Sequence, residues 1–159
     1  MSHFNEVANE WDSKEKIGMM KTLASQVKEN IPLSDKLKIM DFGCGTGLFG
    51  FEFSNYANEL IGVDTSEGML EVFDKKTKGK TGFRSININL EEKDIRETFD
   101  LIVSSMAFHH LNDPFKVLKK LRSCLNKQGK IVIVDLDKED GSFHPDNEAM
   151  GVKHFAFAS

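Results

Sequence analysis

The sequence predicts an α/β fold, in which a doubly wound, mostly parallel sheet forms the middle layer of an αβα sandwich. Two observations predict it. Five short apolar runs alternate with segments of helical character over residues 37–135, and such alternation implies parallel strands joined by right-handed crossovers. The runs at 99–104 and 130–135 are almost wholly apolar, as expected for strands that helices cover on both faces.

Residues 1–30 are predicted to form a helical cap that precedes the sheet. Their apolar side chains recur at helical spacing, at Ile17, Met20, Leu23, Ala24 and Val27. We expect the helix to end at Ile31, because the following proline disfavours a helical conformation in the residue before it.

The sheet and its helices are predicted over residues 37–135. Strands are expected at 38–42, 59–64, 81–87, 99–104 and 130–135, and helices at 47–55, 66–77 and from Asp113 to before Gly129. Ser66 and Asp113 suit the N-cap position, and Pro114 suits a first helical turn. Sheets of this kind bind ligands at the carboxyl ends of their strands.

Composition narrows the classes of function. A chain of 159 residues fits a single domain, and its net charge of −4 disfavours nonspecific binding to nucleic acid. No apolar run approaches the roughly 18 residues of a membrane span, and the amino terminus has no signal-peptide pattern. Cys44 and Cys124 form neither a disulfide framework nor a zinc pattern. We therefore expect reduced thiols, a cytoplasmic location and no bound metal.

The glycine-rich turn over residues 41–47 carries the sharpest functional information. Gly43, Gly45 and Gly47 leave a buried strand and enter a helix, where glycine permits positive φ and close approach of a ligand. The free N–H groups at a helix start favour an anionic or polar ligand group. Asp64 ends the next strand, and a carboxylate there can accept hydrogen bonds from both hydroxyls of a ribose. Together they predict a cofactor that contains adenosine.

Two cofactors fit this pattern. Residues 45–50 satisfy the dinucleotide pattern G-x-G-x-x-G, so an NAD-binding oxidoreductase fragment is one alternative. Against it, Asp41 stands two residues before the first glycine, and we expect no second, catalytic domain to follow. A nucleotide-phosphate loop is excluded, because Gly79-Lys80-Thr81 lacks the earlier glycine.

The acid-led turn, residues 41–47, resembles the first motif of class I S-adenosylmethionine-dependent methyltransferases, and residues 62–70 are similar to their second-strand motif. Residues 99–103 and 125–133 resemble their fourth and fifth strands. The opening residues 4–12 resemble the segment that lies over the cofactor in the small-molecule (type 11/12-like) branch. The resemblance implies a Rossmann-like fold for a single domain, residues 1–159, and methyl transfer from S-adenosylmethionine to a small-molecule acceptor, with S-adenosylhomocysteine as product.

The resemblance also implies which residues bind the cofactor. The glycine turn, with Cys44 inside it, is expected to approach the methionine part, and Asp41 to orient that turn. Asp64 is expected to hold the ribose. The remaining expected contacts are Thr65, Met69, Asn89 and Leu90 around the adenine, Ser104 and Ser105 beside the methionine part, and Trp11 over the pocket. The family usually has aspartate at the position of Asn89, so this adenine contact is expected to be weaker than with a carboxylate.

Two histidines follow the fourth predicted strand. His110 and His109 are the candidates for a general base, since histidine titrates near neutral pH. Of the two, we expect His110 to influence turnover more. Besides a methyltransferase and an NAD-binding oxidoreductase fragment, a third hypothesis remains open. In it the chain is a cofactor-binding module without its own activity that acts through a partner.

Residues 136–159 form a tail with few strong patterns. The sheets of this family normally carry seven strands in the order 3-2-1-4-5-7-6, whereas only about five are evident in this sequence. The tail is too short for a further helix and an antiparallel hairpin, so we expect residues 131–134 to present an unpaired apolar edge. Such an edge tends to pair with another chain. This predicts either a piece of a longer protein or a homo-oligomer that covers this edge.

Overall fold

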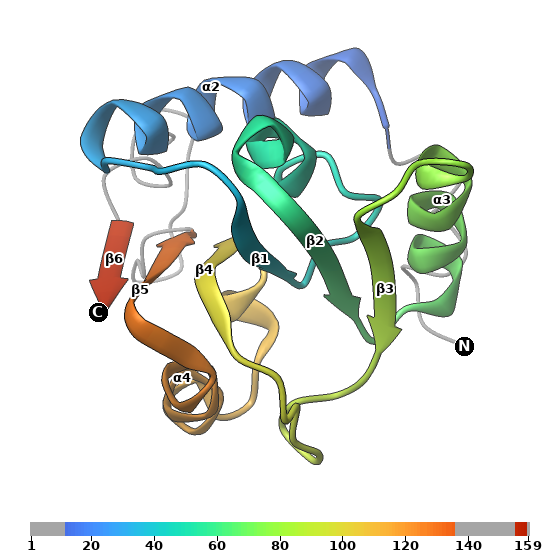
Figure 1. Ribbon diagram of the computed structural model, residues 1–159. Coiled ribbons are helices and arrows are strands. Elements are labelled where there is room, and N and C mark those ends of the chain that lie inside the picture. The colour runs from blue at the N-terminus through green and yellow to red at the C-terminus, as the bar shows by residue number, and fades with distance from the viewer. Residues whose placement is uncertain (1–11, 136–154, 159) are drawn as a thin grey trace, which may run out of the picture.

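The computed structural model describes residues 12–135 and 155–158, and it contains one sheet between helices (Figure 1). The described strands lie side by side in the order β3-β2-β1-β4-β5-β6. They are β1 (Leu37–Phe42), β2 (Ala57–Asp64), β3 (Phe83–Asn87), β4 (Phe99–Ser105), β5 (Leu125–Val134) and β6 (Phe155–Ala158). The first five are parallel and β6 is antiparallel to β5. The predicted doubly wound, Rossmann-like α/β fold is confirmed.

Helices cover both faces of this sheet. They are α2 (Lys14–Asn30), η2 (Gly50–Tyr56), α3 (Glu67–Thr77), η3 (Phe108–His110) and α4 (Pro114–Ser123), of which η2 and η3 are 3₁₀ helices. Leu23 of α2, Phe53 of η2 and Phe73 of α3 share one buried cluster with one face of the sheet. Val117 and Leu121 of α4 pack in a second cluster, on the opposite face. The three layers expected from the sequence are therefore present.

Three helices begin at residues suited to the N-cap position, and α2 ends where its sequence predicts. Ser13 caps α2 and Ser66 caps α3, because each hydroxyl accepts a hydrogen bond from an N–H group in the first turn. Asp113 caps α4 in the same way, with Pro114 at the first helical position. Ile31, the residue before Pro32, is the extended residue at the end of α2.

Three elements differ from the prediction in kind or extent, and one of them is α4, which ends at Ser123 rather than just before Gly129. The helix expected over 47–55 is the short 3₁₀ helix η2. The fifth strand starts at Leu125 rather than Lys130, and it runs through Gly129. A Cβ atom at Gly129 would lie 2.9 Å from the carbonyl oxygen of Asn126 and 3.1 Å from that of Phe99. This glycine therefore permits a close backbone approach inside the strand instead of ending the preceding segment.

A sixth strand, missed in the sequence, pairs with β5. Residues 155–158 pair antiparallel with residues 131–134, from Ile131 opposite Ala158 to Val134 opposite Phe155. The expectation of an unpaired edge at residues 131–134 is therefore wrong, because a segment of the same chain pairs with it. Self-association through this edge remains a prediction, but the unpaired backbone that motivated it is absent.

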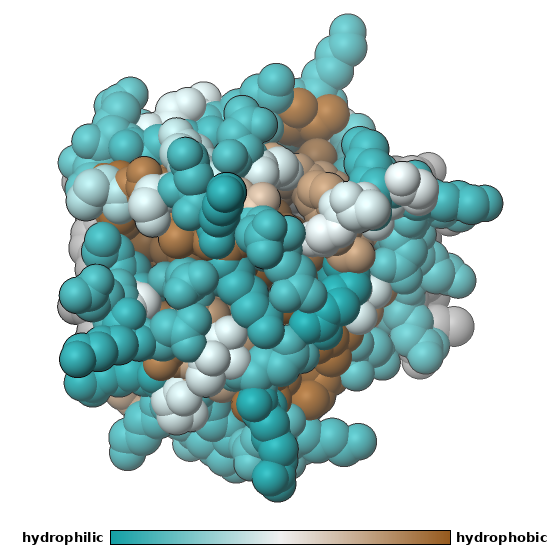
Figure 2. All heavy atoms as spheres, in the orientation of Figure 1, coloured by the Kyte–Doolittle hydropathy of each residue, from teal (hydrophilic) through white to brown (hydrophobic). Residues whose placement is uncertain are grey.

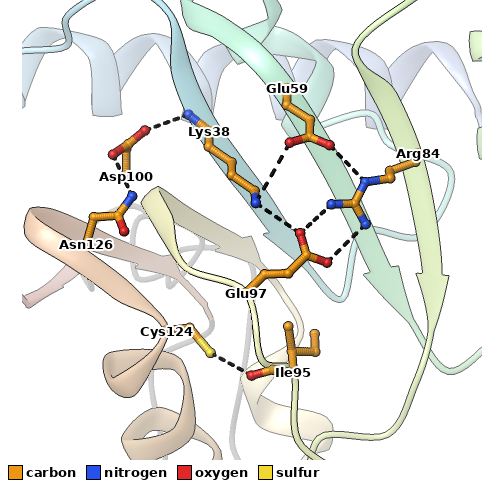
Figure 3. A network of polar contacts seen from close by, with 8 residues as sticks. All are labelled: Lys38, Glu59, Arg84, Ile95, Glu97, Asp100, Cys124 and Asn126. Carbon is orange, nitrogen blue, oxygen red and sulfur yellow. Dashed lines mark hydrogen bonds and ion pairs between the residues drawn. The ribbon is translucent and has the colours of Figure 1, made fainter.

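A charged cluster, here called the ion ladder, crosses the face of the sheet on which α4 packs (Figure 3). It consists of Lys38 on β1, Glu59 on β2, Arg84 on β3 and Glu97 before β4. Lys38 pairs with both glutamates, with Nζ 3.0 Å from Glu97 Oε1 and 3.9 Å from Glu59 Oε1. Arg84 donates to Glu59 at 2.8 Å and holds Glu97 by two nitrogens. No helix connects β3 to β4 within residues 88–98, so these side chains lie where a covering helix is absent.

The face seen in Figure 2 is largely hydrophilic, with small apolar areas between the charged side chains. Among the described residues, the large apolar side chains that are exposed are Met19 on α2 and Phe115 on α4.

Candidate functional site

The glycine turn connects β1 to η2 at the carboxyl edge of the sheet. Gly43, Gly45 and Gly47 have φ values of 68°, 57° and 98°, a region that residues with a Cβ atom rarely adopt. The N–H groups of Gly43 and Cys44 both donate to the carbonyl oxygen of Val63, at 2.8 and 3.0 Å. The turn is thus fixed against the end of β2.

Asp64, at the end of β2, joins this turn to the start of α3. Its Oδ2 accepts a hydrogen bond from the N–H of Gly45 at 2.7 Å, and its Oδ1 accepts one from Ser66 at 2.9 Å. The side chain is partly exposed. Because each carboxylate oxygen can accept more than one hydrogen bond, Asp64 can still bind two neighbouring hydroxyl groups.

Asp41 lies beneath the turn and is buried, with 1% of its surface exposed. Its Oδ2 accepts a hydrogen bond from the N–H of Gly50 at 3.0 Å. Burial raises the pKa of Asp41 to about 8; the Gly50 hydrogen bond opposes this rise and the negative charge of Asp64 adds to it. A Cβ atom on Gly50 would lie 2.4 Å from Asp41 Oδ2, so this contact requires glycine at position 50.

The turn offers few N–H groups to an anion. Those of Gly43, Cys44 and Gly45 are bound to Val63 and Asp64, and that of Gly47 donates to the carbonyl of Cys44 at 2.9 Å. A phosphate-binding turn instead directs several free N–H groups at its ligand. Together with two carboxylates, this arrangement disfavours a pyrophosphate group and favours a ligand group that carries positive charge.

A second contact ties the turn to two other elements. Thr46, between the second and third glycines, is 1% exposed. Its hydroxyl donates to Asp12, which precedes α2, and Lys76 of α3 forms an ion pair with the same carboxylate. Lys76 Nζ also donates to the carbonyl oxygen of Thr46 at 3.1 Å. These three residues, here called the Thr46 clamp, fix the middle of the turn from outside.

The end of β4 lies against the other side of the turn. A Cβ atom on Gly43 would lie 2.4 Å from the Cβ of Ala107, so glycine is needed here for contact with the chain itself. The hydroxyl of Ser104 is buried and has no hydrogen-bond partner among the described residues. Ser105 contacts α2, with its hydroxyl 3.6 Å from the sulfur of Met20.

The two histidines differ in their contacts. His109 donates its N–H to Oδ2 of Asp135 at 2.9 Å, and its ring nitrogen Nδ1 lies 2.6 Å from Oδ1 of the same carboxylate. The rings of His109 and His110 are 4.0 Å apart.

Burial lowers the pKa of His110, and the charge of His109 lowers it further, whereas Asp135 and Asp64 oppose the change. Asp135 directly follows β5, and sequence reasoning missed it, although its place at a strand end pointed to the site.

Comparison with known proteins identifies the family. The profile of a family described as a methyltransferase domain matches residues 40–131, from β1 to β5. The chain belongs to this methyltransferase family. An uncharacterized methyltransferase of Schizosaccharomyces pombe is 32% identical in an alignment of 139 positions, which covers 74% of this chain and 47% of that protein. The chain thus spans about half the length of this curated relative.

Solved methyltransferase structures have the same fold. The YcgJ protein of Bacillus subtilis superimposes with a TM-score of 0.68 at 25% identity, over 76% of this chain and 53% of that one. A coclaurine N-methyltransferase, solved with N-methylheliamine and S-adenosylhomocysteine, gives 0.64 at 19% identity, over 72% and 35% of the two chains. At this identity the second likeness concerns the fold alone.

Within this methyltransferase domain, the other predicted cofactor residues lie in different surroundings. Thr65 is exposed at the carboxyl edge, next to Asp64. Met69 is 2% exposed and packs beneath the first turn of α3. Burial raises the pKa of Cys44 well above its usual value. Its thiol therefore stays protonated inside the core, and only its backbone belongs to the turn.

The predicted adenine pair, Asn89 and Leu90, follows β3. Asn89 Oδ1 accepts a hydrogen bond from the N–H of Glu91 at 2.9 Å, so this oxygen already stabilises a local turn. Leu90 is 2% exposed and belongs to the cluster beneath α4. Trp11 lies outside the described residues. The structure thus brings the turn, Asp64 and the β4 end together, and it places Leu90 and Met69 in the core.

The described residues offer neither a metal centre nor a membrane-spanning helix. The described residues contain no group of three histidine, cysteine, aspartate or glutamate side chains that could hold a metal ion. None of the described helices has both the length and the apolar character needed to cross a membrane. A cavity of about 170 Å³ lies near the start of β1 and β4, lined by Pro32, Leu37 and Asp100 among others. It contains none of the predicted cofactor residues.

Proposed function

We propose that this chain binds S-adenosylmethionine at the glycine turn and transfers its methyl group to a small-molecule acceptor. One observation carries the proposal: Asp41 and Asp64 place two carboxylates beside a turn whose N–H groups are mostly bound within the protein. A ligand with a cationic sulfonium and an ammonium group stabilises the ionised forms of these two acids, including Asp41, whose pKa burial raises to about 8 in the free protein. The family to which the chain belongs supports the same reaction class.

The residues present fit this cofactor. Asp64 can accept hydrogen bonds from ribose hydroxyls, and its hydrogen bond with the N–H of Gly45 fixes it beside the glycine turn. The buried hydroxyl of Ser104, unpartnered among the described residues, offers a polar contact at the end of β4. When bound, the cofactor supplies a methyl group on a positively charged sulfur.

The protein itself contributes to the reaction by positioning the cofactor and the acceptor. Alignment of the acceptor with the methyl carbon can lower the barrier by several kcal/mol, up to roughly 7–11 kcal/mol in favourable cases. Asp41 and Asp64 hold the cofactor in place, and the Thr46 clamp fixes the glycine turn against which the cofactor lies. The proposal includes a cytoplasmic location, supported by the two free cysteines, and an acceptor that is not nucleic acid, supported by the net charge of −4.

An NAD-binding oxidoreductase fragment is the competing function. Its pattern, G-x-G-x-x-G over residues 45–50, uses Gly50 as the third glycine. In the structure the N–H of Gly50 donates to the buried carboxylate of Asp41. A pyrophosphate near this position would face Asp41 and Asp64, so the geometry favours the sulfonium cofactor.

Isothermal titration calorimetry with S-adenosylmethionine, S-adenosylhomocysteine and NAD tests the proposal. We expect both adenosyl compounds to bind and NAD not to bind. Binding of NAD alone would refute the methyltransferase function. Transfer of radiolabelled methyl groups to a panel of small acceptors then separates an enzyme from a cofactor-binding module without activity.

A further inference from the structure

His109 and Asp135 form a pair at the carboxyl edge, where β4 and β5 end. Asp135 holds His109 at two points, since its two oxygens contact the backbone N–H and the ring nitrogen Nδ1 of the same residue. The carboxylate side chain is 11% exposed and the imidazole is 35% exposed. A mostly buried acid therefore fixes the orientation of a ring that remains accessible to a ligand.

This contact determines which ring nitrogen can accept a proton. Only a protonated Nδ1 can donate to the carboxylate, so Nε2 of the neutral ring carries a lone pair. Nε2 has no hydrogen-bond partner among the described residues. The pair thus has the arrangement of a general base with an orienting acid: one nitrogen is held and the other is available.

The pair lies next to the glycine turn. Ala107, two residues before His109, would touch any Cβ atom placed on Gly43. Phe108 contacts Phe42 of β1, with ring centroids 5.6 Å apart. The charge of Asp64 also acts on His110, whose ring is 4.0 Å from that of His109. The segment that carries His109 is therefore packed against the proposed cofactor site.

We propose, resting on the function proposed above, that His109 is the general base of methyl transfer, that Asp135 is its positioning residue, and that the acceptor is a hydroxyl compound. As the acceptor oxygen bonds to the methyl carbon, the S–C bond breaks and its electron pair stays on sulfur. The hydroxyl proton passes to Nε2 of His109, and the imidazolium then pairs with Asp135 until the proton is released to water. A neutral amine or a thioether attacks without losing a proton first and does not need such a base.

Three neighbouring groups act on this proton transfer. Asp135 stabilises the imidazolium, Asp64 adds a negative charge at longer range, and His110 lies against the ring. A charged His110 would oppose protonation of His109, but burial and the charge of His109 lower the pKa of His110. This lowered pKa favours the neutral form of His110 beside a protonated His109. The structure favours His109 over His110 as the base, the reverse of the order expected from the sequence.

Nitrogen-15 NMR of the imidazoles in the full chain tests the geometry without an acceptor. We expect His109 to carry its proton on Nδ1, and Asp135→Asn to remove this preference. The His109 Nε2 signal should also differ between the S-adenosylmethionine and S-adenosylhomocysteine complexes, because only the former carries a positive sulfur. His109→Gln assigns the signal. A proton on Nε2, or a signal insensitive to the charge on sulfur, would overturn the proposal.

Methyl transfer to a series of phenols of increasing acidity tests the chemistry. We expect His109→Gln to lower kcat about 10²–10⁴-fold, with little change in KM and loss of the acid limb of the pH–rate profile. The defect should shrink as the phenol becomes more acidic, because an ionised acceptor needs no base. Asp135→Asn should lower kcat by about 10–100-fold, by analogy with other residues that orient a histidine. Lys116→Met, on the exposed side of α4, is the matched control and should leave the rate unchanged.

The outcomes separate this proposal from the function on which it rests. If calorimetry detects no S-adenosylmethionine binding, the proposed function itself fails. If the cofactor binds but His109→Gln keeps the wild-type rate on phenols, only the base assignment is overturned. The same holds if only tertiary amines or thioethers are methylated. If no acceptor reacts, the NMR comparison of the two cofactor forms decides.

Discussion

Two clusters of charged side chains lie on the same sheet and differ in how their charges are balanced. In the ion ladder, Lys38 and Arg84 bind the carboxylates of Glu59 and Glu97 (Figure 3). At the glycine turn, the carboxylates of Asp41 and Asp64 accept hydrogen bonds only from backbone N–H groups among the described residues.

This difference indicates different roles for the two regions. The carboxylates of the ion ladder have cationic partners within the chain, so they stabilise the face that lacks a covering helix. The acidic pair at the turn has no lysine or arginine partner among the described residues, so a cation from outside can neutralise it. We therefore expect changes in the ladder to alter stability, and changes at the turn to alter cofactor affinity.

The largest expected effect is at Gly50. A Cβ atom there would meet Asp41 Oδ2 at 2.4 Å, so Gly50→Val must displace a buried carboxylate and break its hydrogen bond. We expect a loss of about 2–4 kcal/mol in unfolding free energy, measured by urea denaturation, together with loss of cofactor binding. The matched control is Gly18→Ala in α2, where a Cβ atom meets nothing within 4 Å. This change should stabilise by about 0.5–1 kcal/mol; equal effects at both sites would refute the argument.

The next effect separates the two regions directly. Asp64→Ala removes a charged acceptor for the ribose hydroxyls, and we expect cofactor binding to weaken by about 1–3 kcal/mol in calorimetry. Glu97→Gln, in the ion ladder, should leave the affinity unchanged and lower the stability slightly, since exposed ion pairs contribute about 0–1 kcal/mol. The opposite pattern, with affinity sensitive to Glu97 and not to Asp64, would place the cofactor elsewhere.

The sequence predicted the parts of this comparison that depend on local patterns. The glycine turn and Asp64 could be identified from the sequence. The combination of spaced glycines after an apolar run with an acid at the end of the next strand is specific for a cofactor-binding turn. The caps Ser66 and Asp113 followed from residue type. The five parallel strands followed from alternation of apolar runs with helices.

The parts that were missed depend on contacts between distant residues. Asp135 meets His109 across 26 positions, and Asp12 meets Thr46 across 34, so neither pair forms a local pattern. Strand β6 is four residues long, and its pairing depends on the edge of β5 rather than on its own sequence. Leu90 is apolar whether it contacts a ring or the core, so residue type alone could not separate the two.

The unfolding free energy should change with pH in opposite directions for the two regions: one contribution falls as pH rises, and the other falls as pH drops. Burial raises the pKa of Asp41 from 3.8 to about 8, so the folded state binds the extra proton, and this contribution to stability falls as pH rises from about 4 through 8. Hydrogen bonds from Arg84 lower the pKa of Glu97 from 4.5 to about 2, so that contribution is present above pH 4.5 and is lost as pH falls through about 2.

The variants that remove each titrating group check these signs. Asp41→Asn should abolish the decline in unfolding free energy between about pH 4 and 8, and Glu97→Gln should weaken the decline below about pH 4.5. A cationic cofactor favours ionised Asp41, so S-adenosylmethionine affinity should rise by up to about 50-fold between pH 6 and 8. Calorimetry in buffers of different ionisation enthalpy should detect the accompanying proton release. An affinity independent of pH would show that Asp41 keeps its charge state on binding.

The smallest expected effect concerns the Thr46 clamp. The clamp supports the glycine turn, but like the ion ladder it contains a pair of oppositely charged side chains, Lys76 and Asp12. Lys76 binds both Asp12 and the carbonyl oxygen of Thr46, and its side chain is 29% exposed. Lys76→Met keeps the aliphatic stem over Phe51, whose ring centroid is 5.6 Å from Nζ, and removes the charge together with the hydrogen bond to Thr46. Because the turn then loses an outside support without losing a ligand contact, cofactor affinity should fall by about two- to fivefold, or about 0.5–1 kcal/mol.

Lys75→Met is the matched control on the same helix, since Lys75 is exposed, and it should leave the affinity unchanged. High salt should reduce the difference between the two variants, since screening already weakens the ion pair in the native protein. A fall in affinity that is the same for both lysines would instead indicate a general electrostatic effect of α3, with no specific role for the clamp.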